Sequence, residues 1–359
     1  AARTETSPPR LDDALAKLDA ALVVLRQRAP GTASLVDALQ KPAAVLSDQE
    51  KLTEHDATIG EAAALCDGPL STNRVCEMVW VEQGAHLNHN RLPHQALPFL
   101  QRAWDARRKR LGEDHADTLE LASMVAWAQA ESGELATGRA LGEKVYQAYQ
   151  RIYTQPTDTS LRATLRLSRL YKRSNQQDRA VELVDEYIRN ARKLYGDDNP
   201  NTTLGLSDRA SLLFGKGRFD DAAAQFTEVA RAYRKGGSEL NGFIVDGFEG
   251  DALREAGHPA DALPLQRAEV EFMRAHYPKG QHVMLARALV GLGLSEAATK
   301  DFGAALRALD EGLAMHRALK TDDTAIANAR ALRGKVLFDS GKRDEGLAEL
   351  RGALDEMKD

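Results

Sequence analysis

The sequence predicts an all-α fold built as a solenoid of antiparallel helix hairpins, because one small residue recurs at a nearly fixed interval. Successive copies are 40 to 43 residues apart. A period of this size is typical of a stack of supersecondary units, each of which buries its apolar side only against its neighbours. The recurring residues are Ala96, Gly138, Ala180, Ala222, Ala262, Ala305 and Gly346.

One repeat shows how each unit is built. Apolar side chains recur at helical spacing over residues 203–215, which predicts a first helix. Gly217 then suits the left-handed conformation that ends a helix, and Asp220 and Asp221 favour the N-terminus of a second helix. The unit is therefore a helix, a tight turn and another helix. A side chain larger than that of Ala222 would push the two helices apart, at a cost of about 1–3 kcal/mol.

The linkers between hairpins repeat as well. Residues 111–120 (LGEDHADTLE) and 195–204 (YGDDNPNTTL) are near copies, in which a glycine ends one helix and a polar residue caps the next. Together with the hairpin pattern, these linkers resemble the tetratricopeptide repeats of the kinesin-light-chain type over residues 75–359. The resemblance implies a right-handed superhelix whose first helices line a concave groove. Asn175 and Lys300 replace the family's turn glycine, so less ideal turns are expected there.

Residues 1–74 carry a diverged form of the pattern. Residues 10–28 match residues 218–235 and predict a second helix without its first, and residues 32–65 leave room for one diverged hairpin. The sequence therefore predicts diverged helical repeats over 1–74 and a repeat array over 75–359, with about seven hairpins plus a half unit. A start halfway through a unit also suggests that the natural protein continues N-terminally.

The composition excludes several functional classes. A net charge of −5 and a pI near 6.1 give no indication of a nucleic-acid partner. Apolar runs are shorter than the ~18–20 residues needed to span a bilayer, so no direct membrane insertion is expected. Phosphate loops, nucleophile elbows and metalloprotease helices are missing from the sequence, which predicts neither an enzyme nor a cofactor. The stretch 336–338 is expected to be exposed, which leaves homo-oligomerisation open.

The most pronounced charge pattern is a stripe of arginines on one predicted helix. Their spacings of 4, 3 and 4 place them along one face. They are Arg162, Arg166, Arg169 and Arg173. A guanidinium fork suits a carboxylate or phosphate, and the resemblance places this helix in the groove. The stripe predicts a site for a protein or peptide, with an acidic segment as one option. The alternative is a solvated face partly neutralised by Glu120 and Glu131.

Three side chains on the flanking hairpins extend this predicted surface. Trp127 lies on the hairpin before the stripe, and Ser207 and Ser211 lie on the hairpin after it. A tryptophan beside arginines is a candidate hot spot, and the two hydroxyl groups offer hydrogen bonds. The alternative for Trp127 is a place in the ordinary core between hairpins.

The chain has two cysteines, Cys66 and Cys76, on either side of a loop that is expected to join two antiparallel helices. Such a loop brings them within the about 5.5–6 Å Cα separation of a disulfide. A bridge implies an oxidising compartment; the alternative is two buried thiols in a reducing cytoplasm. His86, His89 and His94 follow, but the short cysteine clamp of zinc sites is missing, so no metal site is predicted.

Together these patterns predict a non-catalytic module for protein–protein interaction that binds a partner segment in the concave groove. The composition, rich in Ala, Arg, Leu and Asp, is typical of a bacterial protein. The chain also resembles the C-terminal repeat arrays of bacterial membrane-tethered Ser/Thr kinases and transcription regulators. That resemblance implies an alternative, a periplasmic sensor or docking domain in signalling, and leaves the compartment open between periplasm and cytoplasm.

Overall fold

A computed structural model describes residues 9–48, 52–89, 92–277, 282–319, 321 and 323–357. Within these ranges, all regular secondary structure is α-helical, and 17 helices follow one another along the chain. None of these helices is long and apolar enough to cross a bilayer. The chain divides into two compact units, residues 1–183 and 184–359, with the boundary inside α9.

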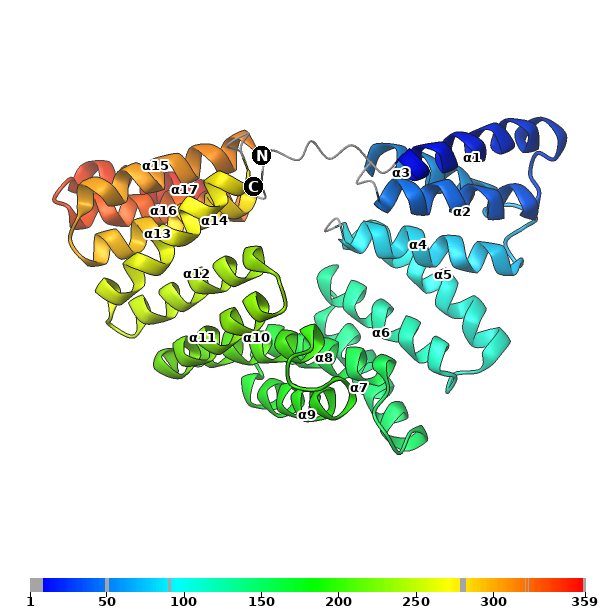
Figure 1. The fold of residues 1–359 in the computed structure, drawn as a ribbon, viewed down its shortest axis with the longest axis horizontal. Helices are drawn as coiled ribbons and strands as arrows, with labels where there is room; N and C mark the ends of the chain where they lie inside the picture. Colours follow the sequence, from blue (N-terminus) through cyan, green and yellow to red (C-terminus); the bar gives the residue numbers. More distant parts are fainter. Residues whose placement is uncertain are drawn as a thin grey trace. The chain divides into compact units, whose positions relative to one another are not determined.

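Unit 1 contains α1 to α8 and the beginning of α9. α1 packs against α2, and the next helices form the hairpins α2–α3, α4–α5 and α6–α7 (Figure 1). α8 contacts the start of α9, where the Ser168 hydroxyl donates to the Ala180 carbonyl at 2.8 Å. The helices are α1 (Pro9–Arg28), α2 (Ala33–Asp48), α3 (Leu52–Leu65), α4 (Arg74–His89), α5 (Pro93–Leu111), α6 (Ala116–Glu131), α7 (Leu135–Ile152), α8 (Asp158–Arg173) and α9 (Gln177–Tyr195).

Unit 2 contains the rest of α9 and four further hairpins, α10–α11, α12–α13, α14–α15 and α16–α17 (Figure 1). The first helices α12, α14 and α16 also contact one another in sequence, as in a stack of repeats. The helices are α10 (Pro200–Gly215), α11 (Phe219–Lys235), α12 (Glu239–Glu255), α13 (Pro259–His276), α14 (Val283–Ala298), α15 (Phe302–Ala318), α16 (Asp323–Asp339) and α17 (Arg343–Glu356).

The number of hairpins differs from the expected one. Helices α2 to α17 make eight consecutive pairs after the half unit α1, one pair more than about seven hairpins plus a half unit. Each of the seven recurring small residues lies in a second helix, from α5 to α17, and the diverged pair α2–α3 adds to those seven. The all-α class and the hairpin architecture are confirmed.

The recurring small residues lie where the two helices of a hairpin touch. All five alanines among them are completely buried. Gly138 makes the closest approach: a Cβ atom there would overlap the carbonyl oxygen of Ala126 and lie 2.9 Å from the backbone nitrogen of Ala130. A Cβ on Gly346 would likewise lie 2.6 Å from the carbonyl oxygen of Gly334. The small residue therefore recurs once per repeat because the two helices of each hairpin approach closely at that position.

The two turns without glycine still form. Asn175 and Lys300 adopt φ angles of 55° and 68°, in the left-handed region that Gly217 occupies in the equivalent turn with φ of 72°. Residues with a Cβ atom pay roughly 1–2 kcal/mol in this conformation. These turns are therefore less favourable than the glycine turns, as the sequence predicted.

The prediction that residues 336–338 are exposed is partly wrong. Val336 and Leu337 of the last hairpin are each only 2% exposed. Val336 packs in a cluster with Ala305 and Leu309 of α15. Only Phe338 of this stretch is open to solvent, at 38%. The stretch faces the preceding hairpin because α16 stacks on α15, so it offers little apolar surface for self-association.

A disulfide joins Cys66 and Cys76 across the bend between α3 and α4, with a Cα–Cα distance of 5.5 Å. Both cysteines are completely buried and belong to the core cluster of unit 1, which also contains Val79 and Trp80. The bridge thus ties the N-terminus of α4 to the end of α3.

Reducing this disulfide is expected to lower the free energy of unfolding by about 2–3 kcal/mol, because the bridge closes a short loop in the unfolded chain. Urea unfolding with and without reductant measures the change. Alkylation of the urea-unfolded chain, followed by intact mass measurement, should label neither cysteine before reduction and both after it. A chain purified under native conditions that is alkylated twice without reductant would contradict the bridge.

Candidate functional site

The predicted arginine stripe lies on α8, the first helix of its hairpin. The N-terminus of α8 is fixed by a capping box, in which the Thr157 hydroxyl accepts from the Ser160 amide at 3.1 Å and the Ser160 hydroxyl accepts from the Thr157 amide at 2.8 Å. Leu161, Leu165, Leu167 and Leu170 are buried on the other faces of the helix. This burial fixes the rotation of α8 and so the direction of the arginine face.

Two of the arginines pair with glutamates of α6, the first helix of the preceding hairpin. Arg162 lies 2.6 Å from Glu120, and Arg173 lies 2.8 Å from Glu131. Each pair joins positions one repeat apart, because consecutive first helices lie side by side. Glu120 and Glu131 therefore neutralise part of the stripe, as the alternative interpretation of the sequence expected. All four side chains are partly exposed, where such pairs contribute about 0.2–1 kcal/mol each.

Arg166 is the arginine that is most engaged with the protein. Its Nη1 donates to the hydroxyl of Ser123 on α6 at 2.8 Å, and Ser123 is only 4% exposed. Desolvation lowers the pKa of Arg166, and the nearby charges of Arg162 and Arg169 lower it further while Glu120 opposes them. Removing the Arg166 guanidinium would leave a buried hydroxyl unpaired. We therefore assign Arg166 a structural contact between α6 and α8.

The remaining predicted residues divide between the two units. Arg169 is half-buried on α8, and Trp127 is half-buried on α6, where it packs against Ala126, Ala130 and Leu170. Trp127 thus belongs to the core between hairpins and also reaches the surface. Ser207 and Ser211 are half-buried on α10 in unit 2. The contacts between α6 and α8 gather the stripe and Trp127 in unit 1, and the two serines belong to the other unit.

The sequence analysis missed the hydrogen bond from Arg166 to Ser123, although a signal for it existed. The two residues are 43 positions apart, which is one repeat, and Arg162 and Glu120 are likewise 42 positions apart. Adding one repeat period to the number of a polar residue on one first helix therefore indicates which residue lies beside it on the first helix of the next hairpin. Eight residues of these two helices form what we call the α6–α8 surface: Glu120, Ser123, Trp127, Glu131, Arg162, Arg166, Arg169 and Arg173.

Unit 2 holds a buried cluster of charged groups that the sequence analysis also missed. Glu269 of α13 is only 1% exposed and accepts a hydrogen bond from Arg287 of α14. Burial raises the pKa of Glu269 to about 8, against the opposing effect of Arg287. Burial also raises the pKa of Asp251, whose carboxylate accepts from Gln266 Nε2 at 3.1 Å.

Glycines make room for this cluster. A Cβ atom on Gly247 of α12 would overlap the carboxylate of Glu269, and one on Gly250 would lie 2.7 Å from Gln266. The two glycines are three residues apart on one helix face. This spacing is the sequence signal for a polar side chain inserted between α12 and α13.

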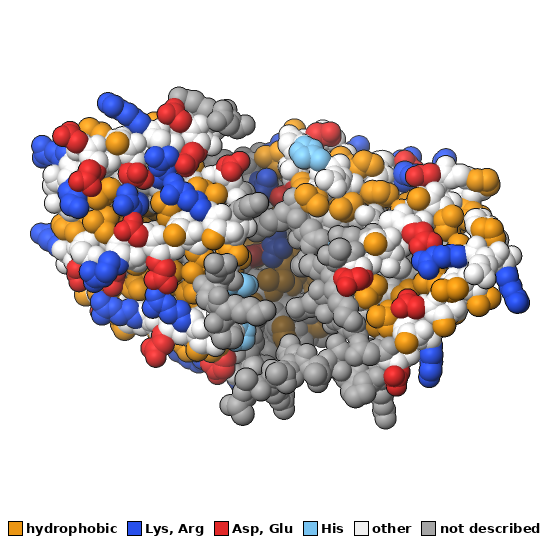
Figure 2. Space-filling model, turned by 90° about the horizontal axis from the view of Figure 1, so that it is seen from above, with side chains coloured by type: hydrophobic (Ala, Val, Ile, Leu, Met, Phe, Trp, Pro, Cys, Tyr) orange, Lys and Arg blue, Asp and Glu red, His pale blue; other side chains and the backbone are white. Residues whose placement is uncertain are grey.

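The face of the molecule shown in Figure 2 carries no field of a single sign. Lys and Arg side chains are interspersed with Asp and Glu over the face shown in Figure 2. In the part of the chain that the structure describes, no three His, Cys, Asp or Glu side chains are placed to hold a metal ion. The α6–α8 surface is a local exception, because its four arginines meet two glutamates.

No family model matches this chain. Among curated proteins, it is 24% identical over 230 residues to the RxLR effector protein SFI4 of Phytophthora infestans (strain T30-4). The match covers 59% of this chain and 65% of that protein, so the chain spans less than two thirds of the relative's length.

Solved structures resemble the chain more extensively. A putative kinesin light chain of Podosopora anserina, with nearly identical TPR-like repeats, aligns with 58% of this chain and 99% of its own at a TM-score of 0.51 and 17% identity. A Rap protein complexed with competence and sporulation factor aligns with 99% of this chain and 89% of its own at a TM-score of 0.60 and 11% identity. At these identities the likeness shows the fold, an array of tetratricopeptide repeats, which confirms the resemblance found in the sequence.

Proposed function

We propose that the chain is a protein-interaction module, without catalytic activity, that binds a carboxylate-bearing segment of a partner protein on the α6–α8 surface. The observation that carries the proposal is the row of four guanidinium groups on one face of α8. The outer two, Arg162 and Arg173, pair with carboxylates of α6. Arg166 and Arg169 lie between these two ion pairs.

The neighbouring tryptophan supports the proposal. Trp127 is half-buried, so its ring is held in place by packing while part of it stays accessible. Rigid aromatic and arginine side chains carry much of the binding energy in protein interfaces. Two related observations come from other proteins: the similar Rap protein is complexed with competence and sporulation factor, and the curated relative is an effector protein.

Reversing the charge of Arg169 is expected to reduce partner recovery about tenfold, because loss of one charge-assisted contact and a new repulsion together cost about 1.4 kcal/mol or more. Pull-down with quantitative mass spectrometry compares wild type with Arg169→Glu. Arg169 is the better target than Arg166, whose loss would leave buried Ser123 without its hydrogen-bond partner.

Arg351→Glu is the matched control. It makes the same change in charge at an exposed position of α17, in the other unit. Both variants should keep the helical circular dichroism of the wild type. A partner that is recovered equally with wild type, Arg169→Glu and Arg351→Glu would overturn the proposed surface.

A further inference from the structure

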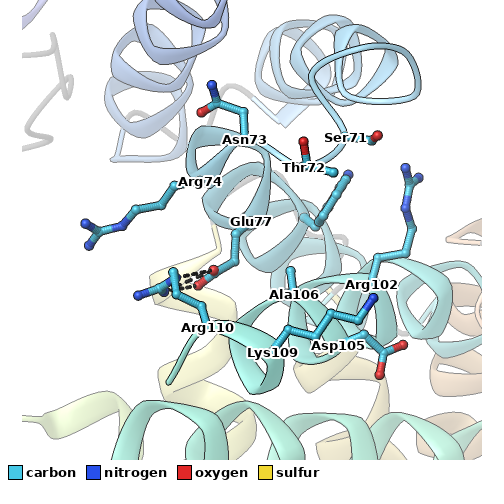
Figure 3. A pocket seen from close by; sticks show the side chains of 11 residues that line it. Ser71, Thr72, Asn73, Arg74, Glu77, Arg102, Asp105, Ala106, Lys109 and Arg110 are labelled. Atoms are coloured by element: carbon cyan, nitrogen blue, oxygen red, sulfur yellow. Dashed lines mark hydrogen bonds and ion pairs between the residues drawn. The ribbon is translucent and has the colours of Figure 1, made fainter. Parts of the chain in front are cut away.

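A second polar site lies in unit 1, away from the arginines of α8. A cavity of about 480 Å³ is open between the bend that precedes α4, the first turns of α4 and the last turns of α5. Its volume lies within the range of about 300–1,000 Å³ that is typical of ligand pockets. Figure 3 shows Arg74 and Arg110 on one side of this pocket and Arg102 and Asp105 on the other.

The carboxylates of the pocket are already occupied by arginines. Glu77 is only 3% exposed, and its oxygens accept from Arg107 and, at 3.0 Å, from Arg110. Asp105 accepts from Arg108 at 3.2 Å. Neither carboxylate is therefore left to neutralise the other cations that line the pocket.

Two lining cations remain without a protein partner. Arg74 and Lys109 are exposed, and in the described part of the chain neither makes a hydrogen bond or an ion pair. Arg74 is also the first residue of α4, where free backbone N–H groups and the helix dipole favour a negative charge. The charge that protein groups leave unneutralised in this pocket is therefore positive.

One residue of the pocket wall carries a buried polar group without a partner. Trp80 is only 3% exposed, and its indole Nε1–H has no hydrogen-bond partner in the described part of the chain. Arg102 lies over the Trp80 ring, 4.4 Å from its centroid, and its Nη1 lies 2.6 Å from Asp67. Buried donors without a partner are rare in native proteins, and the Arg102 guanidinium covers this ring on the side of the pocket wall that it lines.

The opposite wall is held in place covalently. Ser71, Thr72 and Asn73 line the pocket and lie inside the loop that the Cys66–Cys76 disulfide closes. The Asn73 side chain accepts from the Val75 amide at 3.1 Å, so it caps the start of α4. The hydroxyl groups of Ser71 and Thr72 are exposed and add donors at the rim.

We propose that this pocket binds a short acidic peptide segment, with Arg74 and Lys109 contacting its carboxylates. A peptide is favoured over a longer polyanion because the chain as a whole carries a net charge of −5, which repels extended negative charge. This site is separate from the α6–α8 surface and does not depend on it.

Fluorescence anisotropy with fluorescein-labelled hexaglutamate tests the site, and labelled hexaglutamine is the neutral control. Wild type is expected to bind hexaglutamate and not hexaglutamine. The double variant Arg74→Glu/Lys109→Glu is expected to bind hexaglutamate about tenfold more weakly, since two ion pairs with the peptide are lost and two like charges face it. Arg351→Glu, an exposed charge reversal in the other unit, should bind like wild type.

Three results would overturn this site. The first is wild type that does not bind hexaglutamate. The second is a double variant that binds as tightly as wild type. The third is weakened binding in Arg169→Glu alone, which would place the acidic ligand on the α6–α8 surface and leave the proposed function standing. Both substituted positions are exposed, so circular dichroism of the double variant should match that of wild type.

Discussion

Replacing Gly138 by alanine is expected to destabilise the chain by about 2 kcal/mol, within the usual cost of overpacking. The added Cβ atom would overlap the Ala126 carbonyl oxygen and approach the backbone nitrogen of Ala130. Both are backbone atoms of α6 and cannot rotate away as a side chain could, so α6 and α7 must separate. Urea unfolding followed by circular dichroism measures the loss.

Gly60→Ala is the matched control for this experiment. Gly60 lies inside α3, and no atom lies within 4 Å of the position that a Cβ would take. Alanine at such a helical position is expected to stabilise by about 0.5–1 kcal/mol, since glycine gives up more backbone freedom on folding. Replacing glycine by alanine is thus expected to lower the free energy of unfolding at position 138 and to raise it at position 60. Equal shifts of the unfolding midpoint in both variants would contradict the contact at Gly138.

Raising the pH is expected to destabilise the wild-type chain through Glu269. Its pKa is about 8 in the folded chain against a usual value of 4.5, so the folded state binds more protons than the unfolded state between these values. The contribution of Glu269 is therefore fully present below pH about 4.5 and is lost as the pH rises through about 8. A shift of this size corresponds to a loss on the order of 3–5 kcal/mol.

Comparing Glu269→Gln with wild type isolates this effect. Glutamine keeps the shape of the side chain and removes its titration, so the variant should lose less stability than wild type between pH 5 and pH 8.5. The pKa of Asp251 is also raised by burial, so the stability of both proteins should still fall somewhat as the pH rises. Urea unfolding at the two pH values gives the measurement. Parallel pH dependences of wild type and Glu269→Gln would show that Glu269 does not titrate in this range.

The repeat period carried most of the fold prediction. It located the second helices, because each hairpin needs a small residue where its two helices touch, as Gly138 and Gly346 show. The same period would have indicated the hydrogen bond from Arg166 to Ser123, since neighbouring first helices stack with an offset of one repeat. Regular stacking is thus encoded in local spacing, which a single sequence reveals.

Features that depend on particular packing were not predictable in the same way. Glutamate is usually a surface residue, yet Gly247 and Gly250 let α12 and α13 approach so closely that Glu269 and Gln266 are buried. The pocket beside α4 likewise depends on which arginines Glu77 holds. Sequence spacing shows on which face of a helix a charged residue lies. Which oppositely charged residue it pairs with depends on distances in the folded chain.

Photo-crosslinking from position 127 tests most directly whether the α6–α8 surface holds the partner. Trp127 is replaced by p-benzoylphenylalanine, and a second protein carries the same group in place of Tyr146 on α7, the second helix of that hairpin. Both positions are aromatic and half-buried. We expect irradiation to join the partner to position 127 and not to position 146. A partner that crosslinks from position 146 and not from position 127 would contradict binding on the α6–α8 surface.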